Sequence, residues 1–348
     1  MINLMPETKT LICIGSGGVG KTTMSASIAV GKAFEGKKVL VLTIDPSLRL
    51  AQALGIKTDG EIHRVQLPAE ARGELYSCVI NHQKAFEWFI RTAAQSADVE
   101  ELLKNRLYQQ LSGRLSGSQE FTSLISLLRY VNSGSYDLVI LDTPPSQHTW
   151  NFLKGPEKIS ALFNEGVASW FRSADGDSAG IFKKLFNIGT AQVLKALEML
   201  TGSQFMKELA AFFTAIQNWQ GPLEKQVMSC HRLLVAPETE FLLITALDAS
   251  RISEALKLSR EILKQGYRLT GVIVNRIPKW TEVETTHRAI SPRIRELITY
   301  YRDLENNLEK NLGPFKKSIN VYKCFESKQA SDDVASLTRN YSNISVIN

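Results

Sequence analysis

Cysteine is scarce in this sequence. The four cysteines, Cys13, Cys78, Cys230 and Cys324, lie far apart among 348 residues and form no C-x-x-C pair. The N-terminus shows no secretory signal. The pattern excludes a disulfide framework and indicates reduced thiols, so we expect a cytoplasmic protein.

Long apolar runs and blocks of one charge are also missing. No stretch reaches the roughly 18 consecutive apolar residues of a membrane span, so we expect a protein that works in solution or contacts a membrane only peripherally. The net charge of +6 comes from 41 basic and 35 acidic residues spread along the chain. This excess favours an anionic partner such as a nucleotide, but it is too dispersed to predict nucleic-acid binding.

Apolar runs alternate instead with helical patterns. The composition, 44% hydrophobic and 22% charged residues, is that of a globular protein. Strands are expected at residues 10–14, 38–44, 75–80, 136–141, 241–245, 269–275 and 319–322. Helices are expected after residue 21 and at residues 82–94, 98–112, 122–131, 250–265 and 291–312. Strands joined by helices form right-handed parallel units, so we predict an α/β fold with a mostly parallel, doubly wound sheet.

The strand signal stops between residues 150 and 235, where apolar residues recur at spacings of three and four. We therefore predict one domain, residues 1–348, with a helical subdomain inserted at 150–235. Its phenylalanine and methionine residues, including Met199 and Met206, have two interpretations. They line a groove for a hydrophobic client, or they pack against one another and the sheet.

Residues 15–23, GSGGVGKTT, stand between an expected strand and an expected helix. The spacing G-x-x-x-x-G-K-T predicts a phosphate-binding loop, in which glycines turn backbone N–H groups toward a polyphosphate. Lys21 then reaches the β and γ phosphates, and Thr22 offers a hydroxyl to Mg²⁺. The candidate phosphate-binding residues are Gly15, Gly17, Gly18, Val19, Gly20, Lys21, Thr22 and Thr23.

Two aspartates follow expected strands. Ligands bind outside the carboxyl ends of parallel strands, so Asp45 and Asp142 should point toward the bound phosphates. Asp142 is placed to hold Mg²⁺, and Asp45 to orient or deprotonate the attacking water. For Asp45 the alternative interpretation is a helix N-cap.

Four strings in this order, GGVGKTT, TIDPSLRLAQALG, LDTPPSQHT and VIVNRIP, resemble the ArsA-type P-loop ATPases, which include arsenite-pump subunits and tail-anchored-protein targeting factors. The segment at residues 106–121 is similar to the bacterial, anion-transporting branch. The resemblance covers about residues 9–280.

The resemblance implies roles for single residues. Asp45 matches the switch I aspartate that positions water, residues 142–149 match switch II, and Asn275 matches the asparagine that contacts adenine, with Arg276 beside it at the nucleotide. Such proteins bind ATP or ADP and hydrolyse ATP with Mg²⁺. Because this chain has one phosphate-binding loop, the resemblance implies a homodimer.

Three departures from the family are visible. Ser16 stands where the family usually has a lysine that reaches the partner's nucleotide, so hydrolysis is slow or another cation such as Arg49 or Arg276 substitutes. The zinc-binding C-x-x-C of the targeting factors is absent. Arsenite binding needs clustered thiolates, which these isolated cysteines do not provide.

Two alternatives to a hydrolysing ATPase stay open. One is a nucleotide-occupancy switch in which Ser16 marks weak or lost hydrolysis. The other is a relative of the partitioning ATPases that bind DNA or membrane, although those usually lack a long helical insertion and this C-terminus shows no basic amphipathic anchor.

Overall fold

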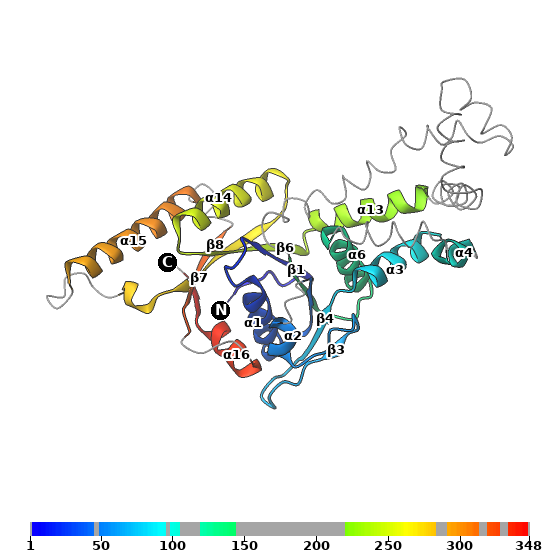
Figure 1. The fold of residues 1–348 in the computed structure, drawn as a ribbon, viewed down its shortest axis with the longest axis horizontal. Coiled ribbons are helices and arrows are strands. Elements are labelled where there is room, and N and C mark those ends of the chain that lie inside the picture. Colours follow the sequence, from blue (N-terminus) through cyan, green and yellow to red (C-terminus); the bar gives the residue numbers. More distant parts are fainter. Residues whose placement is uncertain are drawn as a thin grey trace, which may run out of the picture. The chain divides into compact units, whose positions relative to one another are not determined.

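The computed structural model describes residues 2–44, 49–94, 98–104, 119–143, 220–282, 291–312, 319–327 and 333–346 (Figure 1). By its internal packing the chain divides into two compact units. The first comprises Met1–Asn81, Ser126–Phe152 and Arg232–Asn348, and the second comprises His82–Ile125 and Leu153–His231. The first unit contains the sheet and the phosphate-binding loop.

The described residues of the first unit form a nine-stranded sheet. In chain order its strands are β1 (Thr10–Gly15), β2 (Lys38–Thr43), β3 (His63–Arg64), β4 (Glu74–Val79), β5 (Leu138–Asp142), β6 (Thr239–Ala246), β7 (Leu269–Ile277), β8 (Asn320–Phe325) and β9 (Ile344–Val346). Across the sheet the order is β3-β4-β2-β5-β1-β6-β7-β8-β9. Only the edge pairs β3–β4 and β8–β9 are antiparallel, so the predicted mostly parallel sheet is confirmed.

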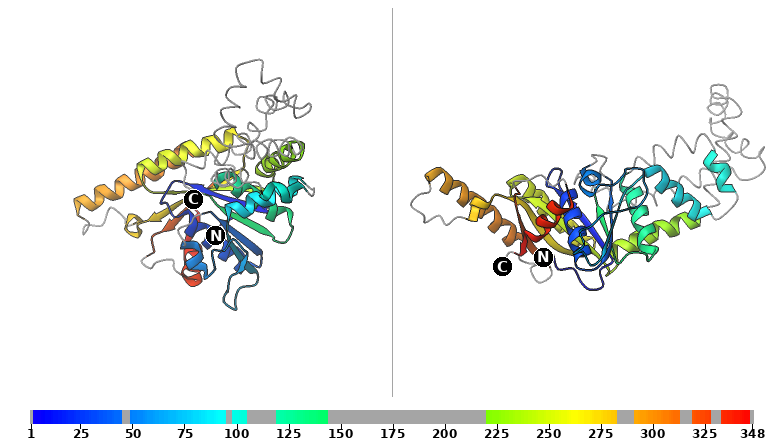
Figure 2. Two further views of the ribbon diagram at one scale, coloured as in Figure 1. Left: turned by 45° about the vertical axis from the view of Figure 1, so that its right-hand side comes forward. Right: turned by 90° about the horizontal axis from the view of Figure 1, so that it is seen from below.

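Helices cover both faces of this sheet (Figure 2). The helices of the first unit are α1 (Lys21–Phe34), α2 (Arg49–Leu54), α14 (Ala249–Lys264), the 3₁₀ helix η2 (Lys279–Glu282), α15 (Pro292–Leu312) and α16 (Val334–Ser342). The crossover after β1 and the crossover after β6 run in opposite directions across the sheet, and right-handed crossovers then place α1 and α14 on opposite faces. Doubly wound folds bind ligands where this direction reverses, which is beside β1.

The central strands of the sheet are largely apolar because helices cover both of its faces. Every residue of β1 is buried, as is every residue of β5, because strands at the centre of a parallel sheet contact helices on each side. The apolar runs on which these strands were predicted therefore follow directly from burial.

The helix α16, late in the chain, packs against α1, which is the first helix. A Cβ on Gly31 would lie 2.2 Å from a ring carbon of Tyr341, so only glycine leaves room for this ring. The Tyr341 hydroxyl donates to Glu35 at 2.6 Å, and Lys32 donates to Glu35 at 2.8 Å and to the carbonyl of Ile2 at 2.9 Å. The C-terminal end of α1 is thus fastened to residues from both ends of the chain.

The second unit is described in part. Its helices are α3 (His82–Ala94), α4 (Asp98–Lys104), the first half of α6 (Gln119–Asn132) and most of α13 (Gln220–Val235). Phe89 packs edge-on against Phe121 with ring centroids 5.1 Å apart, which joins α3 to α6. The larger part of the predicted insertion, residues 150–219, lies outside the described residues, as do residues 105–112 of the helix predicted at 98–112.

Some elements were not predicted. The sequence predicts no helix at α2 or α16 and no strand at β3 or β9, and the strand it predicts at β8 ends at residue 322 instead of Phe325. These elements are short, and β3 and β9 have only two and three residues, too few to show a period. Of the helices in the described ranges, none has the length and apolar character needed to cross a membrane.

Candidate functional site

The loop between β1 and α1 lies at the carboxyl edge of the sheet. Of the eight predicted phosphate-binding residues, Gly15 ends β1, four lie in the loop and three begin α1. The four in the loop are Gly17, Gly18, Val19 and Gly20, and the three in α1 are Lys21, Thr22 and Thr23. Gly20 has φ 89° and ψ 29°, in the left-handed region. A Cβ there would also lie 2.5 Å from Nδ2 of Asn275. Glycine is therefore required at this position for two reasons: the backbone is left-handed, and the Asn275 side chain leaves no room for a Cβ.

Asn275 fastens this loop to β7. Its Nδ2 donates to the carbonyl oxygen of Val19 at 2.8 Å, and the side chain is buried. Because Nδ2 is used in this bond, the amide orientation is defined and Oδ1 is the atom left to accept from a ligand. The residue predicted to contact a base thus also shapes the phosphate-binding loop.

Lys21 opens α1 and is 7% exposed. Its ammonium group donates to the carbonyl oxygen of Ser16 at 2.9 Å, so the side chain bends back across the loop. The N-terminus of α1 carries the partial positive charge of a helix dipole, and Thr22 and Thr23 present further N–H groups there. An anion at this place meets a charge, a dipole and unpaired helix N–H groups together.

Thr22 and Asp142 meet beside the loop. The Thr22 hydroxyl donates to Oδ2 of Asp142 at 2.7 Å, and the Thr43 hydroxyl donates to the same atom at 3.0 Å. No group of three His, Cys, Asp or Glu side chains gathers anywhere in the described ranges. A Mg²⁺ ion bound to phosphates needs only one or two protein oxygens, because phosphate and water supply the others, so this hydroxyl–carboxylate pair fits the ion.

The residue after Asp142 is fixed to β1. Thr143 donates both its backbone N–H, at 3.2 Å, and its hydroxyl, at 2.7 Å, to the carbonyl of Cys13. The predicted switch II segment, 142–149, therefore starts from an anchored end. Its remainder and Asp45 lie outside the described residues.

Ser16 and the two candidate substitute cations are placed differently. Ser16 is 1% exposed, so its hydroxyl is enclosed within the loop. Arg276 is exposed at the end of β7 with φ 58°, a left-handed conformation that costs a residue with a Cβ about 1–2 kcal/mol. The side chain of Arg49 lies outside the described part of the chain.

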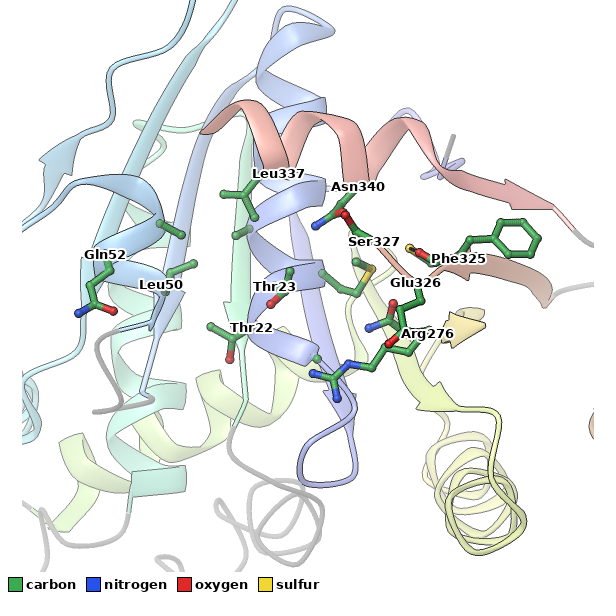
Figure 3. A pocket seen from close by; sticks show the side chains of 16 residues that line it. Thr22, Thr23, Leu50, Gln52, Arg276, Phe325, Glu326, Ser327, Leu337 and Asn340 are labelled. Atoms are coloured by element: carbon green, nitrogen blue, oxygen red, sulfur yellow. Dashed lines mark hydrogen bonds between the residues drawn. The ribbon is translucent and has the colours of Figure 1, made fainter. Parts of the chain in front are cut away.

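A cavity of about 740 Å³ adjoins the loop within the first unit. Figure 3 shows its walls: the first turns of α1, the ends of β7 and β8, and residues of α2 and α16. Thr22, Thr23, Asn275 and Arg276 line it on the loop side. The volume is that of a typical small-ligand site.

The opposite wall of the cavity was missed by sequence reasoning. It includes Glu326 and Ser327 after β8 and Leu337 and Asn340 of α16. A local signal for α16 existed, since Asp333 caps the helix in a capping box with Ser336. Nothing local, however, indicates that this helix returns to α1.

The four cysteines are all buried and free. Burial raises the pKa of the Cys13 and Cys230 thiols to about 12 and of the Cys78 and Cys324 thiols to about 11. Thiols that are neutral and enclosed are poor metal ligands and nucleophiles.

A family model described as anion-transporting ATPase matches residues 8–311. The chain belongs to this family. It is accordingly an ATPase of the ArsA type, and the resemblance drawn from the four motifs is confirmed. The matched range ends before β8 and α16, which supply part of the cavity wall.

Named relatives agree with this assignment. The chain is 26% identical over 289 residues to an "ATPase ASNA1 homolog" of Cryptosporidium parvum, which covers 79% of the chain and 69% of the relative. It is 25% identical over 280 residues to a "Putative arsenical pump-driving ATPase 1" of Aquifex aeolicus, covering 77% and 63%. It is 31% identical over 149 residues to "ATPase get3" of Aspergillus terreus, covering 41% of each.

Proposed function

We propose that this protein hydrolyses ATP with Mg²⁺ at the loop beside α1. Gly17, Gly18, Gly20 and Lys21 bind the phosphates, Thr22 and Asp142 hold the ion, and Asp45 orients or deprotonates the water. The observation that carries the metal assignment is the 2.7 Å contact between the Thr22 hydroxyl and the Asp142 carboxylate. The bound ion supplies positive charge beside the β and γ phosphates.

The proposed base site is the cavity beyond Thr23. Asn275 uses Nδ2 for Val19, so its Oδ1 accepts a hydrogen bond from the amino group of adenine, whereas the O6 carbonyl of guanine in the same place is repelled. The buried amide therefore favours ATP and ADP over guanine nucleotides.

We propose further that nucleotide state is coupled to a conformational change acting on a partner. In this proposal the chain is one ArsA-like domain that works as a homodimer in the cytoplasm, and the helical insertion at 150–235 holds a protein client. The switch II segment starts from the anchored Thr143, and a γ phosphate that moves the rest of the segment changes its position relative to the sheet.

The buried Ser16 favours a second candidate, a nucleotide-occupancy switch with little hydrolysis. A lysine here in the family reaches the partner's nucleotide, and an enclosed hydroxyl provides neither that reach nor that charge. Ser16→Lys separates the two candidates. A large gain in turnover together with dimerisation indicates a degenerate ATPase, one whose hydrolysis is limited by the missing lysine. Unchanged turnover indicates a redesigned site that does not depend on a lysine at this position.

Phosphate release with ATP and Mg²⁺ tests the main proposal. Lys21→Ala should abolish turnover and Asp45→Asn should reduce it strongly, while the exposed matched controls Lys264→Ala and Asp303→Asn should keep it. Wild-type protein that binds ATP without any turnover would favour the occupancy switch. Trapping Asp45→Asn with ATP and measuring its mass in solution then tests the homodimer.

A further inference from the structure

The backbone at Arg276 departs from the regular strand. The pairing of β7 with β8 shifts register between Val274 and Ile277, as in a β-bulge. Among the described residues, Arg276 is the sole non-glycine with a positive φ. Bulges of this kind usually place glycine in the left-handed position. The arginine found here adopts this backbone conformation although its Cβ makes the conformation unfavourable. Strained residues of this kind concentrate at functional sites.

The bulge turns two successive side chains toward the same place. Neighbouring residues of a regular strand point to opposite faces, yet Asn275 and Arg276 both line the cavity. Nε of Arg276 lies 3.9 Å from where a Cβ on Gly20 would be. Figure 3 shows the guanidinium group directed toward the N-terminal turn of α1, on the side of Thr22.

The charge of Arg276 is available to a ligand. Within the described part of the chain its guanidinium forms no ion pair, whereas the ammonium of Lys21 is bonded to the carbonyl of Ser16. Glu326 is the carboxylate that lines the same cavity. A guanidinium presents a planar set of donors that matches two phosphate oxygens at once.

We propose that Arg276 binds the α and β phosphates of the nucleotide from the same chain and so supplies a positive charge that Ser16 cannot. The inference rests on the proposed function. The guanidinium of Arg276 lies beside Gly20, and the loop amides around Gly20 and the first turn of α1 hold the α and β phosphates. These two phosphates are therefore the ones that Arg276 contacts in the proposal. When the bond between the bridging oxygen and the γ phosphorus breaks, its electron pair stays on the β-phosphate oxygen of ADP, next to this guanidinium.

Equilibrium binding tests the proposal without requiring hydrolysis. Wild type, Arg276→Asn and Arg276→Lys are titrated calorimetrically with ADP, a non-hydrolysable ATP analogue and adenosine. Asparagine accepts a positive φ, so Arg276→Asn removes the charge without adding backbone strain. The control Arg268→Asn removes the same charge at the residue that precedes β7, about 25 Å away along the strand direction.

The expected result is a dissociation constant about 10- to 100-fold higher for both ADP and the ATP analogue in Arg276→Asn, with adenosine unchanged. Arg276→Lys should recover part of the loss, and Arg268→Asn should bind like wild type. A loss confined to the ATP analogue would overturn the assignment to the α and β phosphates, and unchanged affinities would overturn the phosphate contact itself. If wild-type protein bound neither nucleotide, the proposed function would fail instead.

Discussion

Gly20→Ala perturbs the phosphate-binding loop in two separable ways. An alanine at φ 89° carries backbone strain of about 1 kcal/mol. Its Cβ would also lie 2.5 Å from Nδ2 of Asn275, so the amide must move and the buried bond to Val19 is lost. A buried carbonyl left without its donor costs about 1–3 kcal/mol. The total is about 2–4 kcal/mol.

Two measurements follow from this magnitude. The free energy of unfolding in urea, without nucleotide, and the binding free energy of ADP should together lose about 2–4 kcal/mol. Where the free loop relaxes and ADP must restore its shape, the loss appears as a dissociation constant about 30- to 700-fold higher. Gly134→Ala is the control for strain alone, since Gly134 has φ 62° and open space around its Cβ position. That variant should lose only about 1 kcal/mol of stability and bind ADP normally.

A double-mutant cycle isolates the contact. With Asn275→Ala already present, Gly20→Ala should cost only its backbone strain, which leaves a coupling of about 1–3 kcal/mol between the two sites. If the two substitutions were additive in both assays, Asn275 would not hold the loop and the role given to the Val19 bond would be wrong.

Two further predictions concern packing and thiols. Gly31→Ala should lower the free energy of unfolding by about 1–3 kcal/mol, because the added methyl meets the Tyr341 ring, although alanine is the better helix former by about 1 kcal/mol; a more stable variant in urea would contradict this contact. Cys13 keeps its proton up to about pH 12 when folded and to about pH 9 when unfolded, so stability should fall as pH rises through this window. Cys13→Ala should make that fall shallower by about 1.4 kcal/mol per pH unit, and an unchanged slope in pH-dependent urea unfolding would refute it.

Local patterns predicted most of the sheet and the centre of the site. The strands β1 and β5 are buried on both faces, so their apolar runs are visible in the sequence. The glycines and lysine of the loop were predicted from a spacing typical of phosphate binding, and the structure places them between β1 and α1 and at the start of α1. The family assignment followed from motifs of the same kind.

The rest of the site depends on contacts between distant residues. The bond from Asn275 to Val19 joins residues 256 positions apart, and the one from Thr43 to Asp142 joins residues 99 positions apart. No periodicity encodes such a pairing. The bulge at Arg276 could not be predicted from the sequence either. A glycine at this position would have indicated a left-handed backbone, whereas an arginine does not.

The wall that α16 contributes to the cavity has a consequence for synthesis of the chain. The phosphate-binding loop is made first, with residues 15–23, but Leu337 and Asn340 are added more than 300 residues later. A nascent chain therefore contains its loop long before the proposed nucleotide pocket has a complete wall. Full nucleotide affinity should appear only after α16 has left the ribosome and packed on Gly31, so nucleotide binding reports that this helix has docked.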